Sequence, residues 1–237
     1  LALALFAVVV SRRPPDARRT YGYGRMRVLA AFINGLGLLV IAVWIVIEAA
    51  SRLRAPVTIL AGPMLAVAVV GFVVNVIVYL ILRGGTDINT RGAMAHVLGD
   101  LLGSAAVIVA AVIILATGWT PADPLLSLVV AALIVRTGLH VTRESGHALL
   151  EGSPPEFYAG KVERSLLGAI PELKDVHHVH AWTVGADDSY VTLHVCAAES
   201  LGPDSAVLRV QTHLAEHFGY HHVTVQVEYG ACMDQAH

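Results

Sequence analysis

His96 and Asp100 are four residues apart in a segment that runs into a long apolar stretch ending near Thr117. On a helix, residues with this spacing lie one above the other on the same face. An aspartate at the centre of a membrane helix costs about 2.5–3.5 kcal/mol, so such a residue usually has a function. An imidazole and a carboxylate are ligands that suit Zn²⁺ and similar divalent metals. The pair therefore indicates a metal site, and a polar contact that joins two helices remains the alternative.

The composition indicates a membrane protein. The chain has 237 residues, of which 56% are hydrophobic and only 14% charged, and its mean hydropathy is +0.66. About a quarter of the residues of an ordinary soluble domain are charged. The net charge of -2, and the absence from the sequence of a basic cluster interleaved with aromatic residues, argue against nucleic acid as a partner. Because only one of the 12 histidines, His96, precedes residue 140, we expect a membrane part followed by a histidine-rich soluble part.

Hydropathy predicts four complete membrane spans, at residues 28–47, 59–82, 92–117 and 124–141. The apolar run 1–10 is too short to cross a bilayer, so we expect the chain to begin inside a transmembrane helix whose first half is missing. Residues 11–27 form a loop with six arginines and one aspartate, Asp16. By the positive-inside rule, this loop and the C-terminal part lie in the cytoplasm.

The C-terminal part reads as a small α+β domain with the order α-β-β-α-β, similar to a ferredoxin-like fold. We expect a helix opened by Pro154-Pro155 and ended by Pro171, strands at 175–182 and 190–196, a helix at 204–217 and a strand at 223–228. The predicted domains are a transmembrane domain at 1–150 and a cytoplasmic metal-binding and dimerisation domain at 151–237.

Seven segments in order along the chain resemble the cation diffusion facilitator family of zinc and cadmium efflux transporters. They are SRRPP (11–15), YGYGR (21–25), HVLGD (96–100), DPLLS (123–127), LEGSPP (150–155), VHHVHAW (176–182) and VTVQVE (223–228). The resemblance implies a six-span α-helical bundle, of which this chain holds spans three to six and the end of span two. His96 and Asp100 match the metal-binding pair of span five, and the pair of span two would fall before Leu1.

The resemblance also implies the function. It predicts a homodimeric antiporter, not an enzyme, that exports a divalent metal from the cytosol in exchange for protons. Zinc is the first candidate for the metal, with cadmium, manganese and iron(II) as others. We expect an integral protein of the bacterial inner or plasma membrane with a cytoplasmic C-terminal domain.

Further metal ligands follow from the same matching. His177, His194 and Glu228 are expected to bind metal in the cytoplasmic domain, with polar residues at a subunit boundary as the alternative. Strand alternation places His178 and His180 together on the opposite face from His177, which favours a structural or surface role for them. Cys232 is a further candidate thiolate. His213, His217, His221 and His222 are expected on a solvated helix face and loop.

The loop 11–27 is expected to hold no metal. In relatives with a metal site there, histidines fall where this chain has Arg19 and Tyr23, and only Asp16 is kept. By the same matching, Arg25 and Glu151 form a charge pair between the loop and the end of the last span.

One other class of function stays open, and a third is disfavoured by the sequence. The protein could be a membrane-anchored metal sensor or dimerisation module, with the chain as given incompetent for transport. An intramembrane metal hydrolase would need a general base beside an open metal position, such as an HExxH motif, and the sequence contains none.

Overall fold

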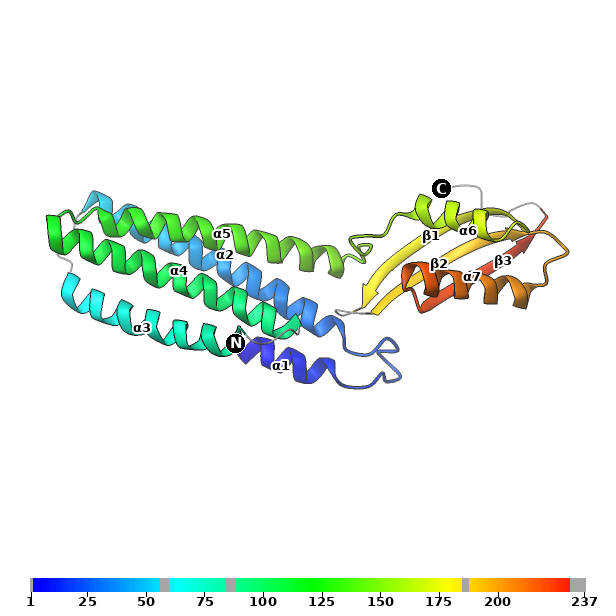
Figure 1. Cartoon of the computed structure of the whole chain (residues 1–237), viewed down its shortest axis with the longest axis horizontal. Helices are drawn as coiled ribbons and strands as arrows, with labels where there is room; N and C mark the ends of the chain where they lie inside the picture. Colours follow the sequence, from blue (N-terminus) through cyan, green and yellow to red (C-terminus); the bar gives the residue numbers. More distant parts are fainter. Residues whose placement is uncertain (1, 56–59, 84–87, 185–187, 231–237) are drawn as a thin grey trace. The chain divides into compact units, whose positions relative to one another are not determined.

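The computed structural model describes residues 2–55, 60–83, 88–184 and 188–230, without the side chains of residues 2, 4, 82, 88–96 and 188. The described residues form, in order, α1 (Ala2–Ser11), α2 (Arg25–Arg54), α3 (Ala61–Leu82), α4 (Ile88–Thr117), α5 (Ala122–Leu149), α6 (Ala159–Ala169), β1 (Leu173–Val184), β2 (Asp188–Ala197), α7 (Pro203–Phe218) and β3 (His222–Tyr229) (Figure 1). Two compact units result, Leu1–Asn34 with Val141–His237 and Gly35–His140. The domain boundary between residues 150 and 151 stays a prediction.

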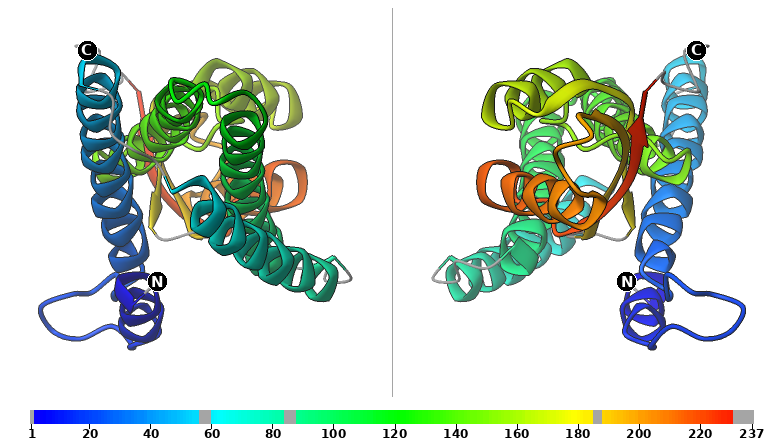
Figure 2. Two further views of the ribbon diagram at one scale, coloured as in Figure 1. Left: turned by 90° about the vertical axis from the view of Figure 1, so that its left-hand side faces the viewer. Right: turned by 90° about the vertical axis from the view of Figure 1, so that its right-hand side faces the viewer.

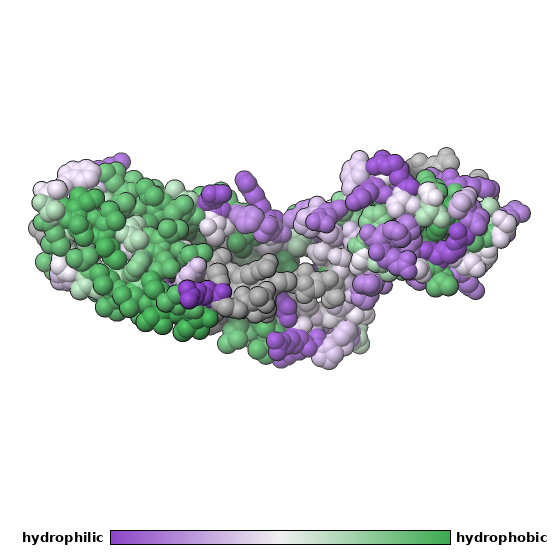
Figure 3. Space-filling model, in the orientation of Figure 1, coloured by the Kyte–Doolittle hydropathy of each residue, from purple (hydrophilic) through white to green (hydrophobic). Residues whose placement is uncertain are grey.

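Four helices in the described residues are long and apolar enough to cross a membrane, in agreement with the four predicted spans. Their apolar segments are Arg25–Arg54, Ala61–Ile81, Val97–Thr117 and Ala122–Leu149. Large apolar side chains such as Trp44, Val67 and Ile81 are more than 70% exposed, and Figure 3 shows hydrophobic surface over these helices. Such a surface suits contact with lipid. α2 and α5 extend beyond the predicted spans because the helical hydrogen-bond ladder continues through their polar ends.

α2 and α5 approach closely through small residues. Each helix buries a residue at every seventh position: Gly35, Ala42 and Ala49 in α2, and Pro124, Ala131 and Gly138 in α5. A Cβ atom on Gly138 would lie 3.0 Å from Cδ2 of Leu39 and 3.2 Å from the carbonyl oxygen of Gly35. Because lipid provides no hydrophobic drive for association, helices in a membrane gain most from such close packing.

One ion-pair network joins α2 to the start of α5 within the Gly35–His140 unit. The Arg52 guanidinium donates to Asp123 Oδ2 and to Glu48 Oε1, both at 3.0 Å. The Asp123 residue is only 8% exposed, and a buried carboxylate needs such a partner. The polar end of α2 is therefore tied to its neighbour.

The C-terminal residues form the predicted α-β-β-α-β order, with a three-stranded sheet in the order β1-β2-β3. β1 and β2 are antiparallel, and α7 provides the crossover that makes β2 and β3 parallel. α6 and α7 lie on the same face of the sheet (Figures 1 and 2). α6 begins at Ala159 and not at Pro154-Pro155, because a residue before proline is disfavoured in the helical region and the chain instead makes a turn, with the Phe157 N–H bonded to the Pro154 carbonyl.

The core of this domain lies between the sheet and the two helices. Alternate residues of β2, namely Val191, Leu193 and Val195, are buried against it, while Tyr190, Thr192 and His194 on the other face are half-buried. The helices contribute Leu166 and Leu214, both fully buried. The sheet face turned away from the helices is therefore available for polar chemistry.

His213 is not on a solvated helix face, and the prediction for this residue was wrong. Its ring is half-buried, with Nε2 2.8 Å from Ser165 Oγ of α6, and stacks on His217 at 4.2 Å between centroids. Burial lowers the pKa of His213, and neighbouring His217 lowers it further, while Glu216 opposes them. His217 and His221 are exposed, as predicted, and His222 is exposed too but is the first residue of β3 and not part of a loop.

Replacing Gly138 with alanine should destabilise the membrane part by about 1–3 kcal/mol, because the added methyl group meets the Gly35 backbone. The thermal unfolding midpoint of the purified protein in detergent measures this. Gly103→Ala is the control, since nothing lies within 4 Å of a Cβ there. The control should be neutral or stabilising through helix propensity, worth about 1 kcal/mol. Equal effects of the two changes would contradict the close helix contact.

His213 should make stability depend on pH. An unfolded histidine titrates near pH 6.5, whereas the folded pKa of His213 is lower. Between these two pKa values the unfolded chain binds more protons, so stability falls as the pH is lowered through about 6.5 toward the folded pKa. Unfolding midpoints at about pH 7.5 and 5.5 should differ less in His213→Gln than in the wild type. His221→Gln, at an exposed position, should leave the difference unchanged.

Candidate functional site

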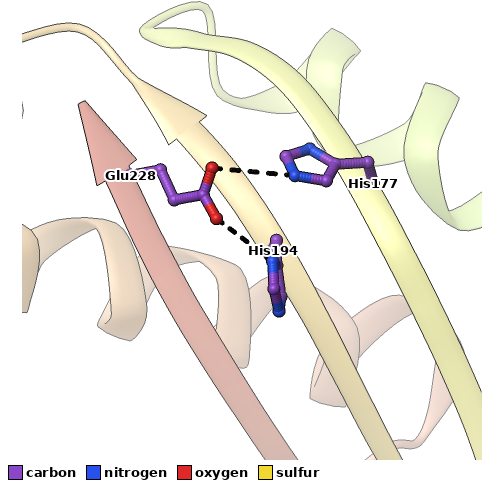
Figure 4. Close-up of side chains that lie close together, drawn as sticks. All are labelled: His177, His194 and Glu228. Carbon is purple, nitrogen blue, oxygen red and sulfur yellow. Dashed lines mark ion pairs between the residues drawn. The ribbon is translucent and has the colours of Figure 1, made fainter. Parts of the chain in front are cut away.

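Three side chains from three different strands converge on the sheet face opposite the helices. They are His177 of β1, His194 of β2 and Glu228 of β3, and each offers one ligand atom within 4.8 Å of the others (Figure 4). His177 is the direct cross-strand partner of His194, so their side chains share a face. In the parallel pair, His194 faces Gln226, and Glu228 follows two residues later on that same face.

The carboxylate of Glu228 lies between the two imidazoles. Its Oε1 is 3.1 Å from Nδ1 of His194, and its Oε2 is 3.7 Å from Nε2 of His177. The Glu228 side chain is only 7% exposed, whereas those of His177 and His194 are 17% and 21% exposed. Gln226 donates from Nε2 to Glu228 Oε1 at 3.0 Å, which helps to hold the carboxylate in place.

The nitrogens of this cluster fit a metal ion better than a hydrogen-bonded network. Nε2 of His177 and Nδ1 of His194, the nitrogens that face Glu228, are buried, and neither has a correctly aligned hydrogen-bond partner in the described part of the chain. A buried polar atom without a partner is costly, and a bound cation would satisfy it. Two imidazole nitrogens and a carboxylate oxygen form a ligand set that suits zinc and other divalent transition metals.

Asp175 completes the surroundings of His177. Its Oδ2 lies 2.9 Å from Nδ1 of His177, on the side of the ring away from Glu228. A carboxylate in this position orients a ligating imidazole and makes it more basic. Sequence reasoning missed Asp175, although its position two residues before His177 in a strand is a signal that could have found it.

His178 lies beside the cluster, and the prediction that it shares a face with His180 away from His177 was wrong. The β1–β2 pairing shifts register between His177 and His180, and His178 has a φ of 49°. This bulge breaks the alternation, so the His178 ring stacks on that of His194, with 5.0 Å between centroids and 17° between planes. His180 is exposed.

The structure leaves several predicted residues untested. His96 lies in α4, but its side chain is outside the described residues, as is all of Cys232. Asp100 is in α4 with an exposed side chain. The predicted charge pair is confirmed, since Arg25 donates to Glu151 Oε1 at 3.1 Å.

Comparison with known families decides the class of protein. The family model described as the cation efflux transmembrane domain matches residues 1–150, and the one described as the cytoplasmic domain of cation efflux proteins matches residues 154–229. The chain belongs to the cation efflux, or cation diffusion facilitator, family. The resemblance identified from the sequence is thereby confirmed, as is the fold class of membrane helices followed by a small α/β domain.

Individual relatives are similar over nearly the whole chain. The zinc transporter ZitB of Escherichia coli (strain K12) is 43% identical over 235 residues, which are 98% of this chain and 75% of the relative. The cadmium, cobalt and zinc/H(+)-K(+) antiporter of Bacillus subtilis (strain 168) is 36% identical over 96% of this chain and 75% of the relative. A solved structure, the metal-bound C-terminal domain of the CzcD transporter from Cuprividus metallidurans, is 30% identical, covers 30% of this chain and 99% of its own, and has a TM-score of 0.28.

Membership of this family makes the chain an integral membrane protein of a transporter class. The prediction that it is not an enzyme is confirmed by the family and by the relatives, which are transporters. Metal efflux and antiport are the activities that the family supports.

Replacing Glu228 with glutamine should remove tight zinc binding at the cluster, because an amide is a poorer, uncharged ligand. Loss of an outer-shell partner of a metal ligand typically lowers metal affinity about 10–100-fold. Glu228 is proposed as a direct ligand, so we expect its replacement to lower zinc affinity at least about 100-fold. Isothermal titration calorimetry of the purified protein with zinc measures the change.

The matched control for that titration is Glu216→Gln on the exposed part of α7. It removes the same charge without touching the cluster and should leave zinc binding intact. A Glu228→Gln protein with wild-type stoichiometry and affinity would rule out the three-residue site.

Proposed function

We propose that this protein is a divalent metal–proton antiporter that exports zinc from the cytosol, with cadmium, manganese and iron(II) as further candidate substrates. The observation that carries this proposal is the His96-x-x-x-Asp100 pair within a membrane-length helix of a cation efflux family member. The named functions of the relatives, zinc transport and cation–proton antiport, support the same assignment.

His96 and Asp100 are proposed to hold the transported metal. A ligating imidazole must be neutral and a ligating carboxylate ionised, so metal binding and protonation compete at these two side chains. When the pair faces the side with the higher proton activity, protons displace the metal. A proton gradient directed inward therefore drives metal outward, provided that the helices expose the pair alternately to each side.

The orientation follows from charge. Six arginines in residues 11–27 favour a cytoplasmic location for this loop and for the C-terminal domain, whereas Gly118–Asp123 at the other ends of α4 and α5 contains no lysine or arginine. The relatives come from bacteria, which supports an inner or plasma membrane location.

The C-terminal domain is proposed to bind regulatory metal and to form a homodimer. The short name of its family model, ZT_dimer, supports dimerisation, and the half-buried polar sheet face offers a surface for it. His177, His194 and Glu228 would hold the metal on that face. The cluster also favours the second candidate function, a membrane-anchored metal sensor.

Replacing Asp100 with alanine should abolish zinc flux, because the site loses both a ligand and a group that exchanges protons. The measurement is zinc uptake into proteoliposomes that contain the full-length protein, under an imposed pH gradient. Asp204→Ala, at an exposed position of α7, should transport like the wild type.

The same assay separates transporter from sensor. Glu228→Gln should keep flux in a transporter and change only its dependence on cytosolic zinc. Unaltered flux in Asp100→Ala, or no flux of zinc, cadmium, manganese or iron(II) in the wild type, would overturn the antiporter assignment.

A further inference from the structure

The loop between α1 and α2 is a folded element built around Asp16. Oδ1 of Asp16 accepts the backbone N–H groups of Arg18 and Arg19, each at 2.8 Å, and Oδ2 accepts the Tyr23 hydroxyl at 2.7 Å. These hydrogen bonds lower the pKa of Asp16, and the bond to the carboxylate raises the pKa of Tyr23. Two further backbone bonds of 3.2 Å join Asp16 and Arg19 in both directions. The loop therefore has a fixed shape.

The six arginines of this region fall into two groups. Three have structural partners: Arg25 pairs with Glu151 at 3.1 Å, Arg27 donates to Ser11 Oγ at 2.6 Å across the base of the loop, and Arg19 lies over the Tyr23 ring at 5.0 Å. The side chains of the other three, Arg12, Arg13 and Arg18, are exposed, and within the described residues they make no ion pair or hydrogen bond. Three of the arginines thus have a partner within the fold, and the other three have no hydrogen bond or ion pair in the described residues.

This surface is positively charged and adjoins a membrane helix. Between Arg12 and Tyr23, four arginines outnumber the single aspartate, and its carboxylate is occupied by hydrogen bonds inside the loop. α2, a candidate membrane span, begins at Arg25, directly after the loop. The anions closest to such a position are the phosphate groups of membrane lipids.

We propose that Arg12, Arg13 and Arg18 form a binding surface for anionic lipid headgroups. A guanidinium donates two parallel hydrogen bonds to a phosphate and is always charged, which suits this ligand better than a lysine would. Basic clusters next to a membrane helix are attracted to anionic lipids. The Asp16 turn holds the backbone of Arg18, and the Arg13 N–H bonds to the Val10 carbonyl at 3.0 Å, so little backbone ordering is needed on binding.

Thermal unfolding of the protein in neutral detergent, with added phosphatidylglycerol or phosphatidylcholine, tests the proposal. At ten times its dissociation constant, phosphatidylglycerol should raise Tm by about 3–6 °C, and phosphatidylcholine should not. Each arginine near an anionic surface raises the affinity for that surface about fivefold. In the variant R12Q/R13Q/R18Q the same shift in Tm should therefore need about 100-fold more phosphatidylglycerol. Because these side chains make no hydrogen bond or ion pair to any residue that the structure describes, Tm without lipid should be unchanged.

Single substitutions provide the matched control. Arg18→Gln should weaken the response to phosphatidylglycerol about fivefold, whereas Arg54→Gln, an exposed arginine at the other end of α2, should not change it. Raising NaCl to about 0.5 M should reduce the wild-type shift through screening.

Three results would overturn the proposal. They are equal shifts with the two lipids, an undiminished shift in the triple variant, and the same shift with inorganic phosphate at equal phosphate concentration, which would indicate a site for free anions. None of these results depends on which metal the protein transports, so the test is independent of the proposed function.

Discussion

A polar side chain in the hydrocarbon of a bilayer has no water to bind, and the architecture of the membrane part follows from this constraint. The helices turn large apolar side chains outward, and α2 and α5 meet through a seven-residue repeat of small residues. Two ion pairs lie near helix ends, Arg52 with Asp123 and Arg25 with Glu151. Asp100 lies one turn inside the apolar segment of α4, Val97–Thr117, and the cost of a carboxylate there is the reason to assign it a function.

The C-terminal domain has the composition of a domain in water and not in lipid, and strand pairing determines where its polar groups lie. The helices α6 and α7 cover one sheet face, so hydrophobic residues alternate toward them. The opposite face brings two imidazoles and a nearly buried carboxylate together because the register sets His177 against His194 and places Glu228 alongside. With the proposed metal sites at His96 and Asp100 in the membrane and at His177, His194 and Glu228 on the sheet, one protein would both transport a metal and respond to its concentration.

Sequence patterns predicted most of the elements and one ion pair correctly. Hydropathy located the four spans, and the alternation of helix and strand signals gave the α-β-β-α-β order. Motif matching found the Arg25–Glu151 pair. Local rules failed at His178, where a bulge interrupts the two-residue period, and at His213, where a helix that looks solvated packs against α6. They also placed the start of α6 at a proline pair that forms a turn.

The sequence by itself therefore determined which part of the chain contacts lipid and which part contacts water. It also determined which residue types are available for chemistry. Hydropathy and side-chain composition are properties of short segments, so they need no tertiary structure. Only the tertiary structure decided which of these residues meet. Strand register and one bulge place Asp175, His178 and Gln226 beside the cluster. Register depends on pairing between different segments of the chain, which a local pattern does not contain. The loop around Asp16 shows the same division. Its charge can be read from the sequence, but only the structure shows which arginines have a partner within the fold.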